Sequence, residues 1–267
     1  MFRLTRQVRF AVNRQADGQL GGKPTNSHGG FPSLRGFGIY LSLEATLLGE
    51  LDPASNYLVN IKQIDSIIRK TAIPFISKAI ADGNQQSPER VVAGVFRLLE
   101  NSWQPLRLDL LRLNLSPFLS ISAKAGELPM VRLSQKFEFS ATHRLHNPAL
   151  SADANVKTFG KCNNPHGHGH NYELQVTLVG TPSADGVLID VPAFESIVAS
   201  AIVDRFDHKN LNVELEEFRE LIPTVENIAR VIYRLLKPQF DDANANLATV
   251  TVWETPKTWC EYGVGDD

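Results

Sequence analysis

The 267-residue sequence has only two cysteines, Cys162 and Cys260, and no large excess of either charge sign. Two cysteines are too few for a disulfide framework or a four-cysteine zinc site, so a reducing, cytoplasmic compartment is expected. A formal net charge of -2 is not the basic footprint of a nucleic-acid-binding protein. No apolar run approaches the roughly 20 residues of a membrane helix, and the N-terminus lacks the apolar core of a secretory signal. We therefore expect neither nucleic acid nor a membrane as a partner.

The residues that are present suit a globular protein with two hydrophobic cores. The hydrophobic residues make up 43% of the chain and the charged residues 21%, which is the usual balance of a folded protein. A chain of this length corresponds to one large or two ordinary domains.

Two segments of the chain share a layout, which favours two domains. GFGIYLSLEATLLG at Gly36–Gly49 parallels GHGHNYELQVTLVG at Gly167–Gly180, and a helical pattern follows each of them. A short strand is expected in between, at Leu58–Asn60 and at Val187–Asp190. We interpret this as a tandem duplication, which divides the chain into domains 1–128 and 129–267. The alternative is that two unrelated α+β halves look alike.

Each half is expected to form strand, strand, helix, helix, strand, strand. In the second half, apolar residues alternate from Val131 to Ala141, as in a strand with one buried face. Pro192 suits the first turn of a helix, and Thr224 is a plausible N-cap of another. The predicted fold class is α+β, with two units that each hold an antiparallel four-stranded sheet and two helices packed on one face.

The strongest chemical signal is the cluster of histidines in the second half. His168 and His170 are two residues apart, so on a strand both side chains project from the same face. His143 ends the preceding strand and is the natural third ligand if the two strands pair. A catalytic zinc site uses three protein ligands and keeps one position open. We therefore predict zinc bound by these three histidines, with His166 outside the ligand set.

Cys162 and several acidic groups surround this predicted zinc site. Cys162 is either a fourth ligand of a closed site or a thiolate base beside the metal. The Asp207-His208 pair has the composition of an acid–base relay, because a carboxylate can orient an imidazole and stabilise its charged form. Glu254 follows Val250 and Val252 at even spacing, so it should point inward, where a carboxylate either pairs or binds a ligand.

The same residues carry a resemblance to a known family. The segment FSATHRLHNPALSADANVKTFGKCNNPHGHGHNY, with DGVLID, RFDHKNLN, PTVENIA and VWETP, resembles the 6-pyruvoyl-tetrahydropterin synthases over nearly all of 131–263. The family pattern Cys-x5-His-Gly-His is filled by Cys162, His168 and His170. The same stretch can also be read with a shorter register, Cys-x3-His-Gly-His, which runs from Cys162 through His166 to His168 and fits the related 6-carboxy-tetrahydropterin synthases. The longer register, through His168 and His170, is favoured. Val225 departs from the family, which often has a second Thr there.

The resemblance implies a carbon–oxygen lyase that needs zinc and acts in tetrahydrobiopterin biosynthesis. Its substrate would be 7,8-dihydroneopterin triphosphate and its product 6-pyruvoyl-tetrahydropterin, with loss of triphosphate. The implied roles are zinc ligands His143, His168 and His170; base Cys162; relay Asp207 and His208; and pterin contacts Thr224, Glu226 and Glu254. The alternatives are 6-carboxy-tetrahydropterin synthase activity on the deazapurine pathway and a non-catalytic zinc- or pterin-binding assembly module.

The first half is expected to be catalytically silent. Aligning Gly36 with Gly167 places Phe37 and Ile39 at the positions of His168 and His170, and Leu115 at that of Glu254. The resemblance further implies the tunnelling fold, whose domains assemble edge to edge into a β-barrel. A homo-oligomer, trimer-based through its C-terminal domains, is the expected assembly.

Overall fold

The computed structural model describes residues 1–13, 24–82, 86–240 and 244–263 and divides the chain into two compact units. Unit 1 is Met1–Leu133 with Gly180–Leu188, and unit 2 is Ser134–Val179 with Ile189–Asp267. Within the described ranges, none of the helices has both the length and the apolar character that a bilayer crossing requires. The predicted boundary near residue 128 stays a prediction.

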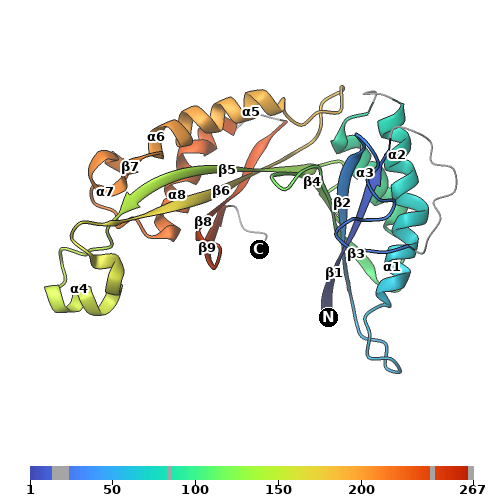
Figure 1. Ribbon diagram of the computed structural model, residues 1–267, viewed down its shortest axis with the longest axis horizontal. Coiled ribbons are helices and arrows are strands. Elements are labelled where there is room, and N and C mark those ends of the chain that lie inside the picture. The colour runs from blue at the N-terminus through green and yellow to red at the C-terminus, as the bar shows by residue number, and fades with distance from the viewer. Residues whose placement is uncertain (14–23, 83–85, 241–243, 264–267) are drawn as a thin grey trace. The chain divides into compact units, whose positions relative to one another are not determined.

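Unit 1 is built on a four-stranded antiparallel sheet with helices on one face (Figure 1). Its strands, in spatial order, are β1 (Phe2–Val12), β2 (Ile39–Gly49), β3 (Arg107–Asn114) and β4 (Leu119–Lys124). Its helices are α1 (Ile61–Ile67), the π-helical turn η1 (Ile68–Ala72), α2 (Ile73–Ala81) and α3 (Pro88–Leu99). Alternate residues of the strands, such as Val8, Phe10 and Leu43, are fully buried under these helices.

Unit 2 has the same kind of layer. Its strands are, in order, β5 (Val131–His143), β6 (His168–Gly180), β8 (Asn246–Thr255) and β9 (Thr258–Gly263), with the short β7 (Lys209–Asn210) parallel beside β5. Its main helices are α5 (Val191–Val198), continued by η3 (Ala199–Val203) and α6 (Asp204–Phe206), and α8 (Val225–Leu236). Shorter pieces are α4 (Ala152–Phe159), η2 (Gly160–Asn163), α7 (Leu211–Glu214), η4 (Glu216–Phe218) and η5 (Lys237–Phe240).

Both units carry the same irregularities at matching places. A β-bulge interrupts β2–β3 at Thr46/Leu47 and β6–β8 at Thr177/Leu178. The chain interval between the two bulges equals that between the two π-helical turns, η1 and η3. A bulge and a π-turn are separate departures from regular structure, so their joint recurrence supports the predicted duplication over a chance likeness. Common ancestry of the halves stays a prediction.

Local signals explain the helix starts, and one pair of predicted strands is wrong. Thr224 caps α8 by accepting a hydrogen bond from the Asn227 backbone N–H, as predicted. Leu58–Asn60 and Val187–Asp190 do not form strands. They end in residues whose extended backbone serves another purpose, because Asn60 and Asp190 are the N-caps of α1 and α5.

Candidate active site

The three histidines of unit 2 converge at the point where β5 ends and β6 begins. His143 is the last residue of β5, and His168 and His170 open β6. Their ligand atoms lie within 4.8 Å of one another, and the Nε2 atoms of His143 and His168 are 3.1 Å apart. Two nitrogens bound tetrahedrally to zinc at about 2.05 Å would be about 3.3 Å apart. The spacing therefore fits a shared metal ion.

Hydrogen bonding orients the fully buried His143 ring for ligation. Its Nδ1–H donates to the Pro223 carbonyl at 2.7 Å, so in the neutral ring Nε2 carries the lone pair. A carboxylate oxygen of Glu254 lies 3.3 Å from this Nε2 and 3.6 Å from Nε2 of His170. Nε2 of His170 is buried and has no hydrogen-bond partner among the described residues. Lone pairs facing one another in this way call for a cation between them, and the donor set suits zinc.

Burial disfavours the charged form of His143 and of His170. It lowers the pKa of His143 to about 4, opposed by the bond to the Pro223 carbonyl and reinforced by the neighbouring His168 and His170. Burial is also the main cause of the lowered pKa of His170, against the attraction of Glu254. Neutral imidazole is the form that binds a metal, so the cluster is prepared for ligation near neutral pH.

The metal-free protein is expected to lose stability as the pH falls from about 6.5 to about 4. The unfolded chain protonates His143 near 6.5 whereas the folded chain resists until about 4, so protons favour unfolding across this interval. At about 1.4 kcal/mol per pKa unit, the loss is at most about 3.5 kcal/mol. Urea unfolding of chelator-treated protein at several pH values measures it. His143→Gln should flatten the pH dependence, and an unchanged slope would contradict the assignment.

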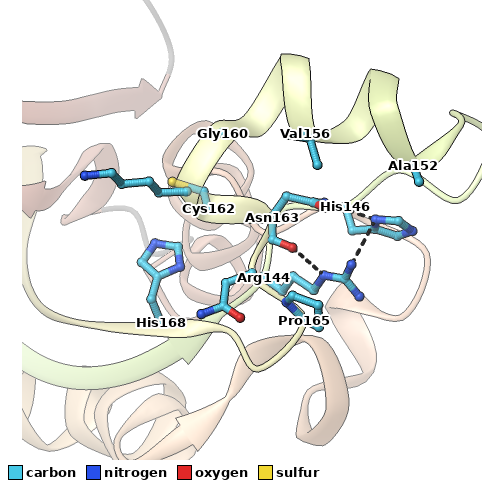
Figure 2. Close-up of a pocket in the computed structure, with 11 residues that line it drawn as sticks. Arg144, His146, Ala152, Val156, Gly160, Cys162, Asn163, Pro165 and His168 are labelled. Carbon is cyan, nitrogen blue, oxygen red and sulfur yellow. Dashed lines mark hydrogen bonds between the residues drawn. The ribbon is translucent and has the colours of Figure 1, made fainter.

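Cys162 lies near the histidines but outside the group that could share an ion. It sits in η2, half-buried, and its carbonyl accepts a hydrogen bond from the Leu145 N–H at 2.8 Å. Among the described residues, the metal-binding group contains only the three imidazoles. Figure 2 shows Cys162 and His168 in the wall of the same cavity, whose volume is about 890 Å³. This arrangement favours a base beside the metal over a fourth ligand.

Asp207 and His208 form the predicted hydrogen-bonded pair, and His208 borders a different cavity from that of Cys162. His208 Nδ1 is 2.7 Å from an Asp207 carboxylate oxygen, and the other oxygen accepts the Ser140 N–H at 2.7 Å. These two bonds lower the pKa of Asp207, the Ser140 contribution being the larger. The His208 side chain is 83% exposed and borders a second cavity of about 420 Å³ together with His170. The pair is therefore held in place and open to a ligand.

Not every predicted site residue meets the large cavity. Glu254 adjoins the histidines, whereas Thr224 caps α8 and Glu226 is exposed on its first turn. None of the three lines the cavity of Cys162. His166 is exposed, and its backbone N–H bonds to Asn164, so it lies apart from the ligand group.

The structure also adds residues that the sequence analysis did not assign to the site. Helix α4 and the loops beside it form much of the wall of the large cavity, and Arg144, His146 and Asn163 line it. No periodic pattern of apolar residues predicted α4, whose eight residues are mostly exposed. Ser151, which is the N-cap of α4, is a residue type that indicates the start of a helix and could have been used to predict it.

Comparison with known proteins points to one family. A sequence model of 6-pyruvoyl tetrahydropterin synthase matches residues 132–264. A 6-pyruvoyl tetrahydrobiopterin synthase of Drosophila melanogaster is 38% identical over 138 residues, covering 51% of this chain and 82% of that protein. A 6-carboxy-5,6,7,8-tetrahydropterin synthase of Haemophilus influenzae is 30% identical over 154 residues, covering 50% and 99%. The solved structure of the Caenorhabditis elegans 6-pyruvoyl tetrahydropterin synthase aligns with a TM-score of 0.48 and 37% identity, covering 51% and 97%.

Proposed function

Because the chain belongs to the 6-pyruvoyl tetrahydropterin synthase family, we propose that it is a zinc-dependent carbon–oxygen lyase. Its proposed substrate is 7,8-dihydroneopterin triphosphate, and its products are 6-pyruvoyl-tetrahydropterin and triphosphate. The observation that carries the proposal is the group of three histidines, one of which, His168, lines the same cavity as Cys162. A group that only bound zinc would not require a thiol on the same wall.

The proposed roles are those that the family resemblance implies, and the positions of several of the side chains support them. His143, His168 and His170 would hold zinc, which acts as a Lewis acid on substrate hydroxyls and makes neighbouring protons more acidic. Cys162 would remove a C–H proton as the C–O bond to triphosphate breaks. Protons then move within the side chain, so no redox cofactor is needed.

The remaining polar groups would serve proton return and substrate binding. Asp207 orients His208, whose exposed ring would exchange protons with the substrate. Glu254, Thr224 and Glu226 are proposed pterin contacts. Because Thr224 and Glu226 lie outside the cavity of Cys162, their role would require a ligand that extends beyond it or a neighbouring subunit.

Unit 1 is proposed to be structural. Under the proposed duplication, β2 would correspond to β6, so Phe37 and Ile39 would occupy the positions equivalent to His168 and His170, and Leu115 the position equivalent to Glu254. No described residue of unit 1 belongs to a potential metal-binding group. We propose that the protein assembles as a trimer-based homo-oligomer in which its sheets close a barrel, which would cover the edge strands β1 and β9.

The function can be tested directly by incubating the zinc-loaded protein with dihydroneopterin triphosphate and identifying the product by mass spectrometry. We expect loss of triphosphate and a pterin with the pyruvoyl side chain. The carboxy product would instead support the deazapurine route, which the Haemophilus relative favours as the second candidate. Unchanged substrate would leave a non-catalytic pterin-binding module as the explanation.

A further inference from the structure

The large cavity beside Cys162 has a cationic wall that the proposed chemistry has not used. Its lining includes Arg144, Lys161 and His146, and none of the described residues that line it is an aspartate or a glutamate. Uncompensated positive charge in a concave site attracts anions, and arginine is well suited to phosphate oxygens. The cavity is therefore electrostatically prepared for a polyanion rather than for the neutral pterin ring.

Local hydrogen bonds hold Arg144 in this wall. Its Nε–H donates to the Asn163 carbonyl at 3.1 Å, and its Nη2 lies 3.4 Å from Nδ1 of His146. Its own backbone N–H bonds to the Asn212 side chain at 2.7 Å. A guanidinium has five N–H donors, so these contacts leave others available for a ligand. These neighbours position the arginine, and no carboxylate among the described residues forms an ion pair with it.

The tautomer of His146 follows from its partners. The Asn163 amide nitrogen donates to the Leu145 carbonyl at 2.7 Å, which fixes the orientation of that amide. The same nitrogen lies 3.0 Å from His146 Nδ1, so Nδ1 accepts, as it also does toward Arg144. In the neutral ring Nε2 then bears the hydrogen. His146 thereby adds a fixed N–H donor beside the arginine.

We propose that Arg144, His146 and Lys161 form the subsite that binds the triphosphate group of the substrate. Figure 2 shows Cys162 and His168 toward one end of the lining and His146 with the Arg144 guanidinium toward the other. The reacting carbon of the substrate would lie near Cys162 while its phosphates extend along the wall. Lys209 is a poorer candidate because it borders the other cavity and its Nζ binds Glu214 at 3.0 Å. This proposal rests on the proposed function.

Binding of inorganic triphosphate, measured by calorimetry on the zinc-loaded protein, tests the subsite without turnover. Arg144→Gln and Lys161→Gln should each weaken binding roughly ten- to hundredfold, since each removes a charged donor. Lys157→Gln is the matched control, because Lys157 is exposed on α4 and does not line the cavity. Its affinity should equal that of the wild type. Equal weakening in all three variants, or in none, would overturn the proposal.

Two further measurements separate the subsite from general damage and from the function itself. Arg144→Gln should leave the affinity for phosphate-free dihydroneopterin unchanged and should raise KM for the triphosphate substrate by the factor seen with inorganic triphosphate. His146→Gln, which can replace the Nε2 donor, should bind triphosphate better than His146→Phe. If the wild type forms product and Arg144→Gln has an unchanged KM, the subsite is wrong and the function stands. If triphosphate binds through Arg144 but no pyruvoyl product forms, the proposed function is wrong.

Discussion

Replacing Cys162 by alanine is expected to lower turnover by about a hundred- to ten-thousandfold while the protein keeps its zinc. A positioned general base contributes roughly 10²- to 10⁴-fold to a rate, and an alanine methyl group can neither accept nor return a proton. Zinc is expected to stay because the ligand group contains three imidazoles and not the Cys162 sulfur. Steady-state product formation, together with metal analysis of the purified variant, measures both effects.

Cys260→Ala provides the matched control for this experiment. Cys260 is the other half-buried cysteine, lies on β9, and contacts the Glu261 carbonyl at 3.7 Å through its sulfur. Loss of a thiol there should leave turnover close to that of the wild type. If Cys162→Ala lost zinc together with activity, a closed four-ligand site would replace the open site argued above.

Much of the fold could be predicted because its signals are local. Alternation marked β5, Pro192 marked the start of α5, and Thr224 marked that of α8. Features that depend on particular side-chain hydrogen bonds could not be predicted. Helix α4 is short and mostly exposed, and its position over the cavity depends on the buried Asn155, whose side chain bonds the carbonyls of Asn147, Leu150 and Ser151. No period in the sequence encodes such a loop-binding amide.

In the candidate site, too, the features with a local sequence signal could be predicted and those that depend on hydrogen bonds in the folded chain could not. His168 and His170 could be paired from spacing alone, since the two-residue period of a strand places both on one face. Which ring nitrogen of His143 is left to bind a metal could not be predicted, because it is determined by the hydrogen bond to the Pro223 carbonyl, 80 positions along the chain. The orientation of Arg144 and His146 could not be predicted either, because it depends on the hydrogen bonds that both side chains form with Asn163.

His168→Ala is expected to weaken zinc binding by more than about a hundredfold, and activity should fall with the metal. Groups that only orient a zinc ligand already contribute ten- to hundredfold to affinity, so removing a ligand should cost more. His168 is the better choice than His143 because it is only half-buried, whereas replacing the fully buried His143 would also disturb packing. Competition with a chelator of known affinity measures the change.

His166→Ala is the matched control for the His168→Ala experiment. His166 is only two residues away, but its side chain is exposed and lies outside the ligand group, so zinc affinity should not change. Loss of zinc in this variant would favour the shorter register of the 6-carboxy-tetrahydropterin synthases. Wild-type protein should hold one tightly bound zinc per chain, because the described part of unit 1 offers no second group. A second tightly bound zinc that survives in His168→Ala would show that unit 1 is not silent.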